Sequence, residues 1–137
     1  MIILAVDYGD VRTGLAICDK NEILSTPMQT VTESYAPKLI EKIKVIAAQK
    51  GAELIVVGKP VNMDGSEGER ARKCMEFAAQ LQESSGIQTE MFDERMTTMI
   101  AASSLNVTNT RGQKRKNVID ALSAQIILQN FIDLRKK

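Results

Sequence analysis

The sequence predicts an α/β fold in which helices cover both faces of a mixed five-stranded sheet. Short apolar runs separated by tight polar turns dominate the first third of the chain, which favours antiparallel hairpins. Helical apolar stripes alternate with buried strands over the remainder, which favours βαβ units. The 137 residues and 44% apolar content suit one hydrophobic core, so we expect a single domain over residues 1–137.

Local patterns place each element. Strands are expected at residues 2–7, 14–19, from 23 onward, 54–58 and 89–93. Helices are expected at residues 36–50, from Ala71 to near Gly86, from Thr97 or Thr98 to 105, and at 118–134. Residues 106–116 show no periodicity and have few apolar anchors, so we expect a mobile loop there.

Composition excludes several kinds of catalytic site. The chain has no histidine, which rules out Ser-His-Asp and Cys-His nucleophile systems and histidine-bound zinc. Carboxylate-only metal sites suit Mg²⁺ or Mn²⁺, so these are the expected cofactors. The net charge is only +1, so any contact with nucleic acid must come from local basic patches.

The sequence also bears on location. Met1 leads directly into an apolar strand, without a basic stretch or a cleavage site, so we expect no signal peptide. No apolar run approaches the roughly 20 residues needed to cross a bilayer, so we expect no membrane contact. Cys18 and Cys74 are far apart and lack metal-site spacing, and Cys74 fits a helical core stripe. We therefore expect a cytoplasmic protein.

Asp7 is the first candidate for chemistry. It ends the apolar run of the first strand and precedes a turn that contains Gly9 and Gly14. A carboxylate held there by a rigid strand needs a partner, such as a metal ion or a cationic side chain. The alternative is that Asp7 only hydrogen-bonds the backbone of its own turn, as many aspartates do.

Two further acidic positions complete a possible site. Asp93 and Glu94 follow the last strand, and ligands of open α/β sheets tend to bind beyond the carboxyl ends of strands. Asp120 lies four residues before an apolar stripe with spacings of three and four, which puts an acid on the inward face of the last helix. The stripe consists of Ala124, Ile127, Phe131 and Leu134. For Asp93 the alternative is an exposed turn in which an Asp pairs with Arg95. For Asp120 the alternative is that the dipole at the helix N-terminus stabilises its charge.

Together these acids predict a site for divalent cations that cleaves phosphodiester bonds. A cluster of carboxylates repels itself without cations, which explains why acids would gather in a site and not in a core. Of the adjacent pair we favour Glu94 as the metal ligand over Asp93, because side chains alternate along a strand and only one of the two should face the site.

Basic residues frame the acids and are candidates for binding nucleic acid. They are Arg12, Lys59, Arg95, Arg111, Lys114, Arg115 and Lys116. The last four precede Asp120 in the expected mobile loop, where they would neutralise phosphates. Arg70 and Arg72, early in the second helix, are interpreted as a solvated surface.

Several motifs, in order along the chain, resemble the YqgF (RuvX) family. They are Asp7-Tyr8-Gly9 with Arg12 and Gly14; Gly58-Lys59-Pro60 with Asn62-Met63-Asp64-Gly65 and Gly68; Asp93-Glu94-Arg95-Met96-Thr97-Thr98; and Lys116 with Asp120 and Ile127-Leu128-Gln129. The resemblance covers essentially the whole chain. One departure is Ser123, where the family usually has the first of two alanines.

The resemblance implies an RNase H-like fold and a nuclease that matures the 5′ end of pre-16S rRNA, in a family first proposed to resolve Holliday junctions. It implies that Asp7, an acid of the Asp93-Glu94 pair and Asp120 form the metal-binding catalytic set. The implied partners are structured RNA, branched DNA and ribosomal precursor particles. The oligomeric state stays open.

Four functions compete at this point. The leading interpretation is a metal-dependent endonuclease on structured RNA, and the same chemistry on branched DNA is its rival. An actin-like or sugar-kinase ATPase lobe also begins with a strand and Asp-x-Gly, but such enzymes close a second lobe around the nucleotide. A nucleic-acid-binding module without catalysis would need the basic residues but not the acids, and fold alone cannot separate these functions.

Overall fold

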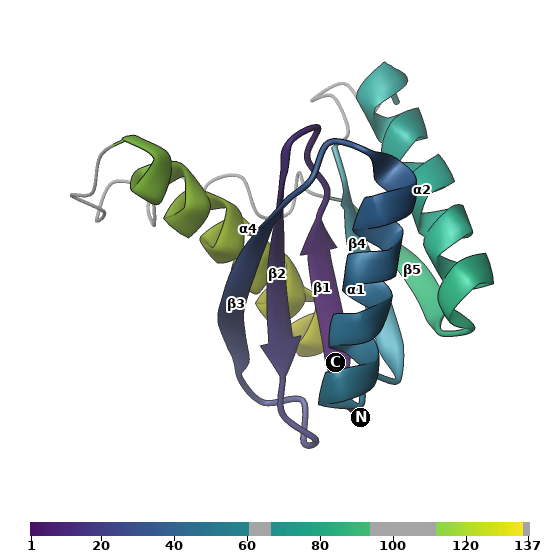
Figure 1. The fold of residues 1–137 in the computed structure, drawn as a ribbon. Helices are drawn as coiled ribbons and strands as arrows, with labels where there is room; N and C mark the ends of the chain where they lie inside the picture. The colour runs from purple at the N-terminus through teal and green to yellow at the C-terminus, as the bar shows by residue number, and fades with distance from the viewer. Residues whose placement is uncertain (61–66, 94–111, 136–137) are drawn as a thin grey trace.

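The computed structural model describes residues 1–60, 67–93 and 112–135, with side chains in the last segment from Ala121 onward (Figure 1). Its elements are β1 (Ile3–Asp7), β2 (Arg12–Cys18), β3 (Ser25–Thr32), α1 (Ala36–Lys50), β4 (Leu54–Lys59), α2 (Glu69–Ser85), β5 (Gln88–Asp93) and α4 (Gly112–Arg135).

The five strands form one mixed sheet in the order β3-β2-β1-β4-β5. β1 pairs antiparallel with β2, which pairs antiparallel with β3. On its other side β1 pairs parallel with β4, and β4 pairs parallel with β5. Helices α1 and α2 cover one face of the sheet and α4 crosses the other (Figure 1). The predicted mixed five-stranded sheet with helices on both faces is confirmed.

Alternation along β1 divides the core into two clusters. Leu4 and Val6 pack with α1 and α2, whereas Ile3 and Ala5 pack with α4. All four side chains are fully buried, as expected for a central strand covered on both faces. Because successive side chains point to opposite faces, this pattern assigns a face to every later residue of the strand.

The C-terminal half of α4 is tied to the start of β3. The Ser25 amide donates to Gln129 Oε1 at 2.9 Å, and the Ser25 hydroxyl donates to the Gln125 carbonyl at 2.8 Å. Gln125 Nε2 donates back to the Ser25 carbonyl at 3.2 Å. These bonds satisfy backbone groups of an edge strand, which would otherwise be open to pairing with another chain. They also fix which end of α4 lies near the β2–β3 turn.

An ion pair closes the same end of the molecule. Arg135 Nε donates to Glu22 Oε1 at 2.9 Å, and the terminal amine of Met1 contacts the other carboxylate oxygen of Glu22 at 3.1 Å. The hydrogen bond from Arg135 is the main reason that the pKa of Glu22 lies below its ordinary value. The last turn of α4 therefore lies at the β2–β3 end of the sheet.

Most predicted elements agree with the structure. Helix α1 has the predicted bounds and ends at Gly51, whose φ of 71° is a left-handed conformation that suits glycine. Cys74 is a buried core residue, as predicted. Leu134, predicted on the inward stripe of the last helix, is 40% exposed, and Leu128 and Ile132 are buried in its place.

The start of the last helix was predicted wrongly. Helix α4 begins at Gly112 and not at residue 118, so the predicted mobile loop is wrong for residues 112–116. Apolar periodicity begins only at Val118, but residues 113–116 are Gln, Lys and Arg, which are good helix formers. Residues 94–111, which include the helix predicted from Thr97 or Thr98, lie outside the described residues.

None of the described helices combines the length and the apolar character that crossing a bilayer requires.

Candidate active site

The candidate site lies at the edge of the sheet where the parallel strands end. Asp7, Lys59 and Asp93 are the last residues of β1, β4 and β5, three adjacent strands that run in the same direction. Strand β2 runs the other way and begins at this edge with Arg12. Four of the predicted site residues therefore share the carboxyl edge of the sheet, the usual place for ligands in open α/β folds.

Asp7 and Arg12 share the face that α4 covers. Asp7 follows Ile3 and Ala5 in alternation, and both pack with α4. Asp7 is paired across the strands with Gly14, and Arg12 lies two residues before Gly14 on the same face. Both side chains are half-buried. A carboxylate and a guanidinium thus occupy neighbouring positions at one edge and on one face.

Asp93 belongs to the opposite face. Met91 packs against the cluster under α1 and α2, whereas Phe92 lies in the cluster under α4. Alternation returns Asp93 to the α1 and α2 side, beside Lys59, its partner in the β4–β5 register. The structure therefore does not bring Asp93 to the face of Asp7. Glu94 lies outside the described residues.

The direction of α4 carries Asp120 toward the same edge as Asp7. Ala124 is fully buried in the cluster that contains Ala5, and the far end of α4 is tied to Ser25 at the opposite edge. Asp120 lies one helical turn before Ala124, and Asp7 lies two residues beyond Ala5. Each step is about 6 Å along its own element, and both lead toward the carboxyl edge. The side chain of Asp120 lies outside the described residues.

The donor set fits a hard divalent cation. Among the residues that the structure describes, no three acidic or sulfur side chains converge as a metal site; Glu94 and the Asp120 side chain are not among them. The predicted metal ligands Asp7, Glu94 and Asp120 are all carboxylates, in a chain without histidine. Oxygen ligands of this kind suit Mg²⁺ and Mn²⁺.

The basic candidates divide into separate groups. Lys59 donates to Glu67 Oε1 at 2.6 Å, so its charge is paired on the α1 and α2 side. Lys114, Arg115 and Lys116 lie in the first turns of α4, whose backbone projects past β3 in Figure 1. Arg95 and Arg111 lie outside the described residues. Arg12 is the one basic candidate whose place beside Asp7 the described backbone supports.

The sequence did not reveal a clamp on the β1–β2 turn. Arg70 Nη1 donates to Asp10 Oδ1 at 2.7 Å, and Nη2 donates to the carbonyl of Tyr8. The same guanidinium lies 5.0 Å from the centre of the Tyr8 ring. The interpretation of Arg70 as a merely solvated side chain was therefore wrong. No local signal could have revealed these contacts, because they join residues about 60 positions apart.

The order of motifs and the fold together agree with one known family. A family model named RuvX and described as a Holliday junction resolvase matches residues 1–134. The chain belongs to the RuvX family.

Three relatives of this RuvX chain match it over almost their whole length. A protein of Lachnospira eligens is 37% identical, with all of both chains covered, and one of Halothermothrix orenii is 37% identical over all of this chain and 98% of its own. A protein of Clostridioides difficile is 36% identical over 97% of this chain and 94% of its own. Each of the three is named as a candidate pre-16S rRNA nuclease.

Solved structures confirm the RNase H-like fold. Thermus thermophilus RuvC, in complex with a Holliday junction substrate, matches with a TM-score of 0.64 at 11% identity, covering 99% of this chain and 96% of RuvC. The fowlpox virus Holliday junction resolvase matches with a TM-score of 0.58 at 10% identity, covering 98% of this chain and 99% of its own. At such low identity the RuvX chain shares their fold, and function needs other support.

Proposed function

We propose that this chain is a metal-dependent endonuclease that cleaves structured RNA and matures the 5′ end of pre-16S rRNA, free or within ribosomal precursor particles. The observation that carries the proposal is the position of Asp7. It ends the central strand, on the face that α4 covers and at the edge toward which Asp120 lies. The names of the full-length relatives support the choice of RNA.

Asp7, Glu94 and Asp120 are proposed to hold Mg²⁺ or Mn²⁺. A cation bound there would lower the pKa of a water molecule and stabilise charge on the leaving oxygen. The protein itself fixes the position of Asp7, because this residue ends a strand whose preceding residues are fully buried. Arg12, on the same face, offsets the negative charge of the carboxylates and attracts a phosphate.

The face assignment predicts which of the two adjacent acids binds metal. Glu94→Gln should weaken Mn²⁺ binding by at least roughly tenfold. Loss of a residue that only hydrogen-bonds a metal ligand already lowers metal affinity by about 10- to 100-fold, and a ligand should matter at least as much. Asp93→Asn should change it less than about twofold, because Asp93 follows Met91 on the α1 and α2 side. Isothermal titration of both variants with Mn²⁺ measures this, and a loss confined to Asp93→Asn would reverse the assignment.

The basic segment before Asp120 should contribute affinity without sequence preference. Replacing Arg111, Lys114, Arg115 and Lys116 together by alanine should weaken binding to RNA and DNA alike. Three consecutive residues of a helix spread over about 200°, so about two of the four should reach phosphates at once. The slope of log K against log salt should therefore flatten by about 2 units.

A matched control for this variant removes four charges from α1. Its lysines are Lys38, Lys42, Lys44 and Lys50. They lie on the helix that covers the face opposite α4, so the salt slope should stay unchanged in their alanine variant. Fluorescence anisotropy at several salt concentrations measures both, and equal slopes in the two variants would show that the segment before Asp120 is only a solvated surface.

The proposed function is tested by incubating the purified chain with Mn²⁺ and a panel of substrates. The panel holds a pre-16S rRNA 5′ fragment, a single-stranded RNA of equal length, and a four-way DNA junction. We expect cleavage of the precursor fragment near the mature 5′ end. A second candidate, resolution of Holliday junctions, is favoured by the description of the matching family, and cleavage of the junction alone would select it. Binding without cleavage of any substrate would indicate a non-catalytic module.

A further inference from the structure

We propose that Arg70 is a positioning residue for this site: it clamps the β1–β2 turn from the opposite face and so fixes Asp7 and Arg12. This inference rests on the proposed function, because it concerns the geometry of the same acids. Asp7 and Arg12 are the residues immediately before and after the turn of residues 8–11. Anything that holds this turn limits the positions that both side chains can take.

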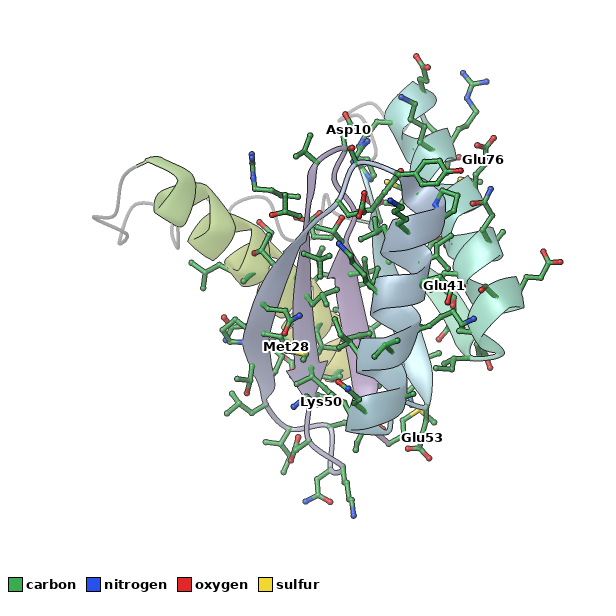
Figure 2. All side chains as sticks on the ribbon, in the orientation of Figure 1. Asp10, Met28, Glu41, Lys50, Glu53 and Glu76 are labelled. Atoms are coloured by element: carbon green, nitrogen blue, oxygen red, sulfur yellow. The ribbon has the colours of Figure 1, made fainter. Side chains whose placement is uncertain are left out.

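The clamp has three contacts on two residues of the turn. The guanidinium donates one hydrogen bond to the Tyr8 carbonyl and another, at 2.7 Å, to the Asp10 carboxylate. It also lies over the Tyr8 ring, 5.0 Å from its centre. Figure 2 shows Asp10 on the turn beside the start of α2, the helix that carries Arg70. A planar fork with several donors suits such a combined contact, and a lysine could not reproduce it.

Tyr8 connects the clamp to the core. Its ring stacks on Phe77 of α2, with centroids 4.2 Å apart and planes 4° from parallel. Tyr8 packs against the cluster under α1 and α2, and Phe77 belongs to that cluster. Arg70, Tyr8 and Phe77 therefore form a stack on the face opposite Asp7. Arg70 acts through the turn, on the other side of the sheet from the proposed phosphate.

Close backbone contacts connect the two sides of the turn. A Cβ atom on Gly9 would lie 1.9 Å from the carbonyl oxygen of Arg12, so the two sides of the turn approach as closely as backbone allows. The Gly9 amide donates to the hydroxyl of Thr13 at 3.3 Å, and Thr13 is fully buried. The Val11 carbonyl accepts from the Glu33 amide at 2.8 Å. Movement at Tyr8 would therefore shift Arg12 as well.

The test compares Arg70→Gln and Arg70→Lys with the native chain, and uses Arg72→Gln, an exposed arginine of the same helix, as the charge-matched control. We expect Arg70→Gln to lower kcat about 10- to 100-fold, the range for residues that orient metal ligands. KM and the salt slope of RNA binding should stay within about twofold, since no phosphate contact is lost. Arg70→Lys should not restore kcat, and Arg72→Gln should match the native chain.

Full kcat in Arg70→Gln would overturn the proposal. So would a raised KM together with a flatter salt slope, which would make Arg70 a phosphate ligand. Full rescue by Arg70→Lys would also overturn it, because charge alone would then suffice. If Arg70→Gln does not fold, Asp10→Asn removes one contact of the clamp, and kcat should fall a few-fold with KM unchanged. An unchanged kcat in folded Asp10→Asn would then count against the clamp.

Failure of the proposed function can be told apart from failure of the clamp. Mn²⁺ affinity by electron paramagnetic resonance and hydrogen exchange of the Gly9 and Glu33 amides require no substrate. If the native chain cleaves nothing, the proposed function fails, yet Arg70→Gln should still weaken Mn²⁺ binding and speed exchange at both amides. Unchanged Mn²⁺ affinity and unchanged exchange would overturn the clamp whatever the activity of the native chain.

Discussion

Asp7→Asn should abolish RNA cleavage and leave the fold almost unchanged. The substitution keeps the shape of the side chain but removes the charge that a divalent cation needs. We expect activity to fall by at least about 100-fold. Mutating a residue that only hydrogen-bonds a metal ligand already lowers metal affinity or activity by about 10- to 100-fold. The free energy of unfolding should change by no more than about 1 kcal/mol, because in the proposed site Glu94 and Asp120 would repel Asp7, so that its charge would contribute little stability.

A turn aspartate at the other end of the sheet provides the control. The Asp19 carboxylate accepts hydrogen bonds from the Ile23 amide at 2.9 Å and the Leu24 amide at 3.3 Å. These bonds lower the pKa of Asp19, as expected of an acid that stabilises its own turn. Asp19→Asn should therefore lower the melting temperature slightly and leave cleavage intact.

Two measurements on Asp7→Asn decide the role of the residue. Single-turnover cleavage of the pre-16S fragment reports on chemistry, and urea unfolding reports on stability. If Asp7→Asn unfolds the chain, or cleaves at the native rate, Asp7 is a structural turn residue like Asp19.

Removing divalent cations should stop cleavage completely. Without histidine in the chain, neither a histidine base nor a histidine-bound zinc is available, so hydrolysis should depend on Mg²⁺ or Mn²⁺. EDTA should abolish activity and added Mn²⁺ should restore it. The far-ultraviolet circular dichroism spectrum should stay the same throughout, because both core clusters consist of protein side chains alone.

Cation binding should also stabilise the fold. At a Mn²⁺ concentration about 100 times the Kd, the expected gain is about 2.7 kcal/mol, seen as a rise in melting temperature that Asp7→Asn largely loses. Cleavage that persists in EDTA, by a preparation shown free of other nucleases, would contradict the mechanism. A native-sized rise in melting temperature in Asp7→Asn would place the cation elsewhere.

Local signals in the sequence were enough for most elements. Helix α1 was predicted with its bounds from a helical apolar stripe over residues 36–50 and from Gly51 as a stop signal, and Gly51 does adopt the left-handed conformation just after its end. Strand β4 was predicted from a continuous apolar run covered on both faces. Helix α4 was predicted too short, because its first turn has good helix formers but no apolar stripe.

The candidate site could be predicted only in part. Asp7 could be singled out because an acid directly follows an apolar run, and this change from apolar to acidic is visible within a few residues of sequence. Nothing in the sequence says which face Asp93 lies on, since Met91 and Phe92 are both apolar and β5 has helices on either side. The packing of Met91 and Phe92 into different clusters decides it.

The sequence by itself therefore determined the order and kind of the described elements, the carboxylate character proposed for the site and the exclusion of histidine chemistry. These depend on residue type and on spacings of a few residues. Only the tertiary structure decided that Asp7 and Arg12 share a face that Asp93 does not, and that Arg70 holds the turn between them. Such contacts join segments about 60 residues apart, and they exist only once strands and helices have packed into two layers around the sheet.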